Sequence, residues 1–147
     1  MSTSLTRRLI RVILVLTVVT LVGTITGAPE RVGALCYGSG CNGIDPNAAG
    51  CGADAYTVTY TYSSGLYAQL RYSSACNANW ARSYSPGGHH FQAYLYSPGL
   101  GVESLVEGNA YDSYHSNMGD GSLYQCAGGA MGPLFQPFNV WINNACG

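Results

Sequence analysis

The chain has 147 residues, of which only 9% are charged, and it contains 12 tyrosines and no lysine. Residues 35–147 carry two arginines against six carboxylates, a formal net charge of −4. A surface of this sign repels the phosphate backbone of nucleic acids, so the sequence predicts no nucleic-acid partner.

The first 34 residues have the pattern of an export signal. Three arginines between positions 7 and 11 precede an apolar run at 12–26, and small residues follow. The run is shorter than the roughly 20 apolar residues that a transmembrane helix needs. We therefore predict a signal peptide over 1–34, cleaved after Ala34, and a secreted, extracellular protein that leaves the membrane once the signal is removed.

All six cysteines lie beyond that cleavage site, and an even number of cysteines in an oxidising compartment predicts disulfide bonds. The spacing of a structural zinc site is absent from the sequence, so we predict three disulfides and no metal. Pairing Cys126 with Cys146 would close a loop and contribute about 3 kcal/mol. Two further bonds, whose pairing the sequence leaves open, would join the remaining four cysteines, Cys36, Cys41, Cys51 and Cys76.

Residues 36–51, CYGSGCNGIDPNAAGC, are dense in the turn-forming residues Gly, Asn, Pro and Asp. We predict an irregular loop that its cysteines hold in place, and we call residues 36–51 the stapled loop. Asp45 followed by Pro46 has the pattern of a turn start, in which the Asp side chain accepts hydrogen bonds from nearby backbone N–H groups. A calcium site is the alternative here, but the DxDxDG spacing is missing.

Residues 56–62, YTVTYTY, alternate large side chains with threonines, which is the period-2 pattern of a half-buried strand. A short Ser-Ser-Gly turn leads into a returning strand at 66–72, whose leucines form an apolar face. We expect Gln69 and Arg71 on the opposite, polar face, beside the threonines of the first strand.

Residues 78–84 are predicted as a strand with Trp80 and Arg82 on one side, and HFQAYLY at 90–96 is another strand with clear alternation. The glycine-rich segment at 128–133, GGAMGP, is predicted to be loose. Weaker strand patterns occur at 102–107, 110–115 and 138–142.

No window of the sequence shows the 3.6-residue apolar period of a helix. Turn residues recur about every 8–12 residues, and the abundant tyrosine and threonine favour strands. We therefore predict an all-β fold, a small disulfide-stapled sandwich or barrel, formed by residues 35–147 as a single domain.

Three motifs occur in this order: CYGSGCNGIDPNAAGC at 36–51, QLRYSSAC at 69–76 and WAR at 80–82. In these motifs the chain resembles the DUF2690 family, whose members are typically secreted bacterial proteins or extracytoplasmic parts of membrane-anchored proteins, with no established activity. The resemblance covers about residues 36–98 and leaves 99–147 as a C-terminal extension. It implies a compartment and a scaffold, but no reaction.

Arg71, Trp80 and Arg82 are the candidate ligand-binding residues. A guanidinium presents a rigid fork of donors to a carboxylate or phosphate, and a tryptophan stacks on sugar faces or planar groups. The alternative is structural, because the arginines would instead donate to backbone carbonyls of the stapled loop or pair with Asp45 or Asp54. No cofactor is predicted.

The three histidines, His89, His90 and His115, are the ordinary general-base candidates near neutral pH. Adjacent residues of a strand point to opposite faces, so His89 and His90 would not bind one ion. The sequence has no GxSxG motif beside them. Glu103 and Glu107 would share a strand face about 13 Å apart, too far for a glycosidase pair.

Exposed tyrosines give rigid, amphipathic contact area of the kind that binds glycans or proteins, although tyrosines also fill strand faces for structural reasons. We therefore expect a secreted, non-catalytic binding or structural domain of the bacterial cell envelope or exterior. Its expected partner is a cell-envelope glycan or an extracellular protein. The alternatives are a small secreted hydrolase that uses one of the three histidines, and a secreted inhibitor or effector.

Overall fold

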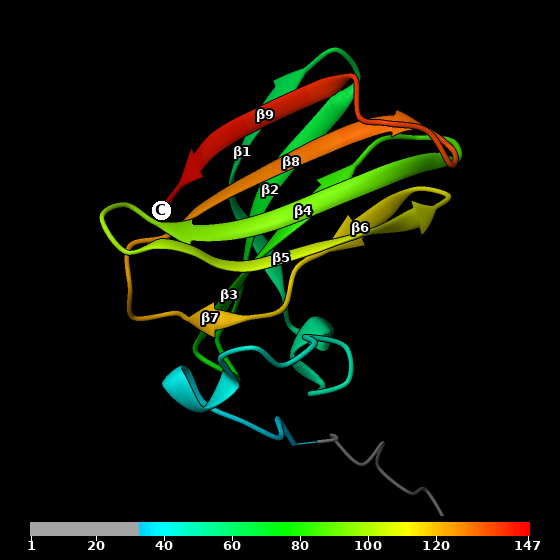
Figure 1. The fold of residues 1–147 in the computed structure, drawn as a ribbon. Coiled ribbons are helices and arrows are strands. Elements are labelled where there is room, and N and C mark those ends of the chain that lie inside the picture. The colour runs from blue at the N-terminus through cyan, green and yellow to red at the C-terminus, as the bar shows by residue number, and fades with distance from the viewer. Residues whose placement is uncertain (1–32) are drawn as a thin grey trace, which may run out of the picture. The chain divides into compact units, whose positions relative to one another are not determined.

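A computed structural model describes residues 33–147 of the chain, and the predicted signal peptide lies almost wholly outside the described residues. The described residues form two antiparallel sheets that pack face to face (Figure 1). One sheet has the order β1-β2-β3-β6, with β7 also paired to β3, and the other has the order β5-β4-β8-β9. The predicted all-β class is therefore confirmed, and of the two predicted architectures, sandwich or barrel, the chain forms the sandwich.

The strands of this part of the chain are β1 (Tyr56–Ser63), β2 (Leu66–Ser73), β3 (Ala78–Tyr84), β4 (His89–Ser97), β5 (Gly101–Ala110), β6 (Ser113–His115), β7 (Gly119–Asp120), β8 (Cys126–Pro133) and β9 (Val140–Cys146). Two short 3-10 helices, η1 (Gly38–Cys41) and η2 (Cys51–Ala53), lie in the N-terminal loop. Within residues 33–147, no helix is both long enough and apolar enough to span a membrane.

The core lies between the two sheets, where alternate residues of each strand meet. Leu66 and Ala68 of β2 pack against Phe91 of β4, and Leu70 packs in a second cluster with Leu95. A polar contact also joins the layers, because the Ser83 hydroxyl of β3 donates to the backbone carbonyl of Gln92 of β4 at 2.6 Å. Apolar packing and this hydrogen bond thus hold the two sheets against each other.

Tyr60 and Tyr62 of β1 lie on the outer face of the first sheet, and the predicted position of Gln69 beside the threonines is wrong. Residues 64–65 both have positive φ and form a two-residue turn. This turn pairs Tyr62 with Tyr67 and Tyr60 with Gln69. Because even-numbered residues of β1 meet odd-numbered residues of β2 as far as the bulge between Thr57 and Thr59, Tyr60, Tyr62 and Gln69 share one face.

The glycine-rich segment at 128–133, predicted to be loose, belongs to the central strand β8 of the second sheet. A Cβ at Gly128 would overlap the ring of Tyr94, and a Cβ at Gly129 would overlap the Ser83 hydroxyl of the facing sheet. Glycine is therefore required here by close packing on both faces, which its low strand propensity does not reveal.

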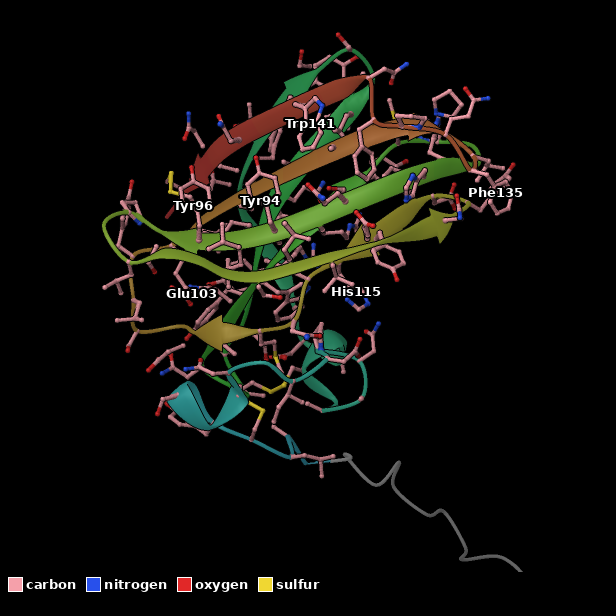
Figure 2. All side chains as sticks on the ribbon, viewed as in Figure 1. Tyr94, Tyr96, Glu103, His115, Phe135 and Trp141 are labelled. Carbon is pink, nitrogen blue, oxygen red and sulfur yellow. A yellow bond between two sulfur atoms is a disulfide. The ribbon has the colours of Figure 1, made fainter. Side chains whose placement is uncertain are left out.

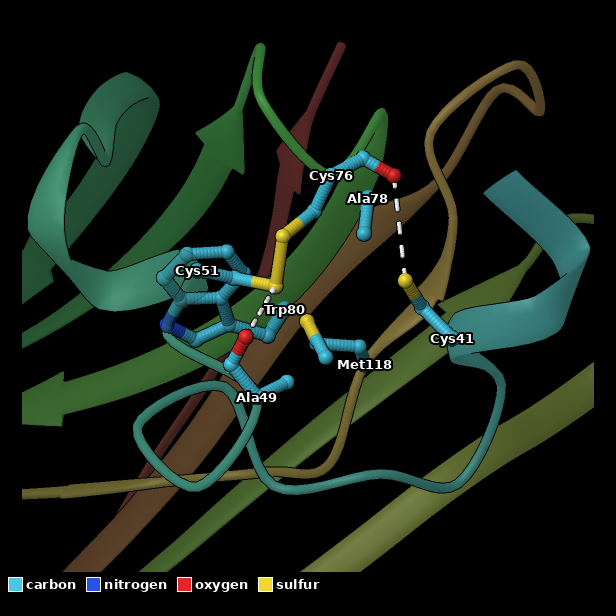
Figure 3. Packing of buried hydrophobic residues seen from close by; sticks show 7 residues of the cluster. All are labelled: Cys41, Ala49, Cys51, Cys76, Ala78, Trp80 and Met118. Atoms are coloured by element: carbon cyan, nitrogen blue, oxygen red, sulfur yellow. Dashed lines mark hydrogen bonds between the residues drawn. A yellow bond between two sulfur atoms is a disulfide. The ribbon is translucent and has the colours of Figure 1, made fainter. Parts of the chain in front are cut away.

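Three disulfides are present, Cys36–Cys41, Cys51–Cys76 and Cys126–Cys146. The predicted number of bonds and the predicted C-terminal pair are both confirmed. The first bond lies within the N-terminal loop, and the second joins this loop to the connection between β2 and β3. Figure 3 shows three of their cysteines packed with Trp80 and Met118 in a small core outside the sandwich.

Two aspartates fix the backbone of this loop region. Asp45 Oδ1 accepts from the backbone N–H groups of Asn47 and Ala48 at 2.8 and 2.9 Å, as the turn prediction required. Asp54 accepts from Ser73, Ser74 and Ala75. Burial opposes its ionisation, but these hydrogen bonds outweigh that effect and hold the pKa of Asp54 below its usual value.

Candidate functional site

Trp80, one of the predicted ligand-binding residues, lies under the stapled loop. It is only 4% exposed and contacts the core formed by the disulfides, as Figure 3 shows. Its ring is therefore a structural anchor for the loop and is not open to a ligand from solvent.

Arg71 is also engaged with the protein itself. Its guanidinium donates to the Thr57 hydroxyl at 2.7 Å and to the Ala55 carbonyl at 2.8 Å. Burial, and then the nearby charge of Arg82, lower the pKa of Arg71. This is the structural arrangement that the sequence left open, in which a backbone carbonyl rather than Asp45 accepts from the arginine.

Arg82 differs from Arg71, because its Nε atom is buried and has no hydrogen-bond partner within residues 33–147. Its guanidinium carbon lies 5.4 Å from the centre of the Tyr84 ring, a cation–π contact. The structure thus separates the two arginines into one bonded to the scaffold and one facing outward among tyrosines.

The adjacent histidines of β4 are both bonded to backbone carbonyls. His89 Nε2 donates to the Pro86 carbonyl at 3.2 Å, and His90 Nδ1 donates to the Gln136 carbonyl at 2.9 Å. His90 also stacks on Phe138, with ring centres 4.6 Å apart. These contacts give both rings a structural or contact role.

His115 is the histidine with a carboxylate nearby, since its Nδ1 lies 3.8 Å from Asp45 Oδ2. Its other nitrogen, Nε2, accepts from the Asn47 side chain at 2.9 Å. Because that amide can only donate, the lone pair that a general base would use is already occupied. A cavity of about 380 Å³ adjoins His115, with Ser113 and Tyr114 in its wall.

Glu103 and Glu107 do not share a strand face, so that expectation is wrong. A bulge in β5 occurs opposite Leu95 and Tyr96, and it shifts the alternation of side chains. Glu103 accordingly accepts from the buried Gln125 side chain at 2.5 Å. Glu107 instead lies beside Gln92 on the outer face of the sheet.

The outer face of the second sheet carries a set of aromatic rings that we call the aromatic platform. Two rings come from the second half of β4, and three more lie on β9, the β8–β9 connection and the start of β4. Figure 2 shows Tyr94, Tyr96 and Trp141 standing on this face of β4 and β9. The platform consists of His90, Tyr94, Tyr96, Phe138 and Trp141.

The rings of the platform contact one another in two groups. Tyr94 and Tyr96 have ring centres 6.1 Å apart. Trp141 meets Phe138 edge to face at 5.3 Å, and Phe138 stacks in turn on His90. Trp141 is 59% exposed, so a large flat indole surface faces solvent.

Hydrogen bonds fix the two tyrosines in place. The Tyr94 hydroxyl reaches across β8 and donates to the Ile142 carbonyl at 3.1 Å, and the Tyr96 hydroxyl donates to Asn144 Oδ1 at 2.6 Å. Burial, and then the neighbouring charge of Tyr96, raise the pKa of Tyr94. Rings held in this way lose little further freedom when a ligand binds.

Small residues on β8 make room for the rings. The outward positions of this strand are Gly128, Ala130 and Gly132. They pair with Tyr94, Trp141 and His90, respectively. The Tyr94 ring covers Gly128, and the backbone at 137–138 covers Gly132. The result is an aromatic surface along the strand rather than a deep pocket.

The sequence patterns do not identify this site. The alternation at 90–96 predicted the strand that carries Tyr94 and Tyr96, but Phe138 and Trp141 lie only in a weak strand pattern. The signal that would have connected them is the alternation of small residues at 128, 130 and 132. Such a run of small side chains on one strand face lets large rings from neighbouring strands lie across it.

A protein-family model described as "Protein of unknown function (DUF2690)" matches residues 39–122. The match begins inside the stapled loop, after Cys36, and includes the whole first sheet and strands β4 and β5. Strands β8 and β9, with Trp141, lie beyond it. No curated protein and no solved structure matches the chain.

Proposed function

The chain belongs to the DUF2690 family, and we propose that residues 33–147 form a secreted, non-catalytic glycan-binding domain of the bacterial cell envelope or exterior, with the aromatic platform as its binding surface. The observation that carries this proposal is the exposed indole of Trp141 on a sheet face where glycine and alanine leave room for neighbouring rings. The three disulfides support an oxidising compartment outside the cytoplasm.

A neutral polysaccharide fits the platform better than other ligands. Aromatic faces bind the apolar C–H faces of sugar rings, and amide side chains accept and donate to sugar hydroxyls. Asn143 and Asn144 are exposed beside Trp141 on β9 and supply such amides. The arginines of residues 33–147 lie on the other sheet, so the platform has no permanent positive charge to favour an acidic ligand.

A flat or extended polysaccharide matches the geometry more closely than a short, enclosed sugar. The outward residues 128–132 of β8 span roughly 13 Å at the usual rise per residue of a strand, so several platform rings are arranged along one direction. Small-molecule sites, in contrast, are usually concave and enclose most of the ligand.

The test is binding of the full chain to insoluble peptidoglycan, chitin and cellulose, measured as loss of protein from solution. The proposal predicts that at least one of these polymers removes the protein, and that Trp141→Ala weakens the binding. Truncation of a central aromatic contact costs about 2 kcal/mol or more, roughly a 30-fold change in affinity. Tyr111→Ala is the matched control, because Tyr111 is 75% exposed and lies off the platform.

Two results would contradict the proposal. One is that none of the polymers removes the protein from solution. The other is that Trp141→Ala binds as tightly as the unchanged chain. Release of soluble sugars from a polymer during the assay would favour the hydrolase alternative, and His115→Ala would then be tested for loss of that release.

A further inference from the structure

The outer face of the first sheet has a different character from the platform. Cross-strand pairing places two layers of side chains side by side on β1, β2 and β3. One layer is aromatic and the other is polar. We call this surface the tyrosine–arginine face, and it consists of Tyr60, Tyr62, Tyr67, Gln69, Arg82 and Tyr84.

Tyr67 lies at the centre of the aromatic layer. Its ring centre is 4.6 Å from that of Tyr62, 5.8 Å from that of Tyr60 and 5.9 Å from that of Tyr84. Tyr60 and Tyr62 are 60% and 55% exposed. The cluster therefore offers several ring faces to solvent, unlike the buried Trp80 on the same sheet.

The polar layer contains two buried atoms without partners. Gln69 lies directly opposite Arg82 on the neighbouring strand. Within residues 33–147, neither Gln69 Oε1 nor Arg82 Nε has a hydrogen-bond partner. Buried polar groups are nearly always paired, so these two side chains have to shift to gain partners, either toward each other or toward a ligand at the surface.

The charge of this face is opposite to that of the rest of the domain. Residues 35–147 have a formal net charge of −4, yet both of their arginines lie on this sheet, on the adjacent strands β2 and β3. The single ion-pair contact within residues 33–147 joins His115 and Asp45, so Arg82 has no carboxylate partner there. A permanent cation without a partner, on an otherwise acidic domain, favours an anionic ligand.

We propose that the tyrosine–arginine face binds a carboxylate-bearing polysaccharide, such as one built from uronic acids. Arg82 donates to the carboxylate, Gln69 accepts from a neighbouring sugar hydroxyl, and the rings of Tyr60, Tyr62 and Tyr67 contact the sugar faces. A uronic acid carries the carboxylate, the hydroxyl and the apolar ring face in one residue. Polyphosphate supplies only the charge and would leave the tyrosines without contacts.

This proposal does not depend on the aromatic platform. The two faces belong to different sheets and share no residue. Failure of one binding activity therefore leaves the other to be judged by its own variants.

The test uses the full chain and two forms of one polymer, polygalacturonate and its highly methyl-esterified form. Esterification removes the negative charge but keeps the sugar backbone. The proposal predicts binding to polygalacturonate that falls roughly 10-fold or more in Arg82→Gln, the range of a charge-assisted hydrogen bond. It also predicts weaker binding to the esterified polymer, and weaker binding at higher salt because the charges are screened.

Three further variants separate the possible outcomes. Arg82→Lys keeps the charge and should bind better than Arg82→Gln, whereas Tyr60→Ala should weaken binding without changing the charge. Tyr111→Ala, which changes an exposed tyrosine outside both proposed binding surfaces, should bind polygalacturonate as the unchanged chain does. Thermal unfolding of each variant checks that it is folded.

The proposal is overturned if polygalacturonate does not bind, if the esterified polymer binds equally well, or if Arg82→Gln has no effect in a folded protein. Equal binding of inorganic polyphosphate would show that the face recognises charge alone, which also contradicts the assignment to a uronic acid polymer.

Discussion

Replacing Gly128 by alanine tests how the aromatic platform is built. The new methyl group would occupy the space of the Tyr94 ring, with which an ideal Cβ at this position overlaps. The neighbouring strands β4 and β9 hold the backbone of β8 on both sides, so the ring rather than the strand has to move. We expect Tyr94 to swing away from β8.

The cost follows from two contributions. Overpacking of a close contact typically destabilises a protein by 1–3 kcal/mol, about 2 kcal/mol here. Loss of the hydrogen bond from the Tyr94 hydroxyl to the Ile142 carbonyl adds about 1 kcal/mol. A total of about 3 kcal/mol corresponds to a fall in Tm of roughly 12 °C for a domain of this length.

The assay is thermal and denaturant unfolding of Gly128→Ala, Tyr94→Ala and the double variant. Because the three atoms nearest to a Cβ at 128 all belong to the Tyr94 side chain, removing the ring should abolish most of the added cost, and the two changes should be strongly non-additive. The reasoning is refuted if Gly128→Ala leaves the Tm unchanged, or if the double variant loses the full sum of both single effects. In the first case the ring does not lie over Gly128.

Three further predictions concern stability and titration. Burial raises the pKa of Asp54, but its hydrogen bonds lower it by more, so the net pKa lies below the usual value. The contribution of Asp54 to stability is therefore present above about pH 4 and is lost at lower pH. Asp54→Asn should flatten acid unfolding curves in that range. Replacing the Cys51–Cys76 pair by alanines should cost about 3.5 kcal/mol in denaturant unfolding, against about 2 kcal/mol for the Cys36–Cys41 pair, because the longer loop restricts the unfolded chain more. An equal cost would contradict this entropic reasoning. Burial raises the pKa of Tyr94, so the stabilising effect of this residue is complete below about pH 10 and is lost as the pH rises further. Tyr94→Phe should remove one late-ionising group from an ultraviolet titration of the tyrosines. An unchanged titration curve would count against this.

The sequence predicted those features that depend on local pattern. The alternation at 90–96 and the turn residues between the strands are local signals, and they identified the strand β4 and the all-β class. The isolation of Cys126 and Cys146 near the C-terminus predicted their disulfide for the same reason. Asp45 as a turn-starting residue was also readable, because its partners lie within three residues.

Features that depend on strand register were not readable from the same patterns. Whether Tyr60 and Tyr62 share a face with Gln69 depends on the turn at 64–65 having two residues rather than three. One residue of difference moves every side chain of a strand to the opposite face. The bulge in β5 had the same effect on Glu103, and this bulge has no clear sequence signal.

The candidate site was missed for a related reason. A glycine-rich stretch has low strand propensity on its own, and only the rings of Tyr94 and the hydroxyl of Ser83 explain why β8 needs glycine. Trp80 was predicted to be a candidate ligand-binding residue, but its burial depends on the stapled loop folding over β3. Contacts between distant segments determined both outcomes.

Tryptophan fluorescence offers the most direct test of the proposed glycan binding, because the chain has two tryptophans in opposite surroundings. Trp80 is 4% exposed and Trp141 is 59% exposed. The full chain would be titrated with soluble oligosaccharides of the polymer that removes it from solution. Stacking on the platform predicts a blue shift of the emission that persists in Trp80→Phe and disappears in Trp141→Phe. A shift that remains in Trp141→Phe, or saturable binding with no change in emission, would contradict the account.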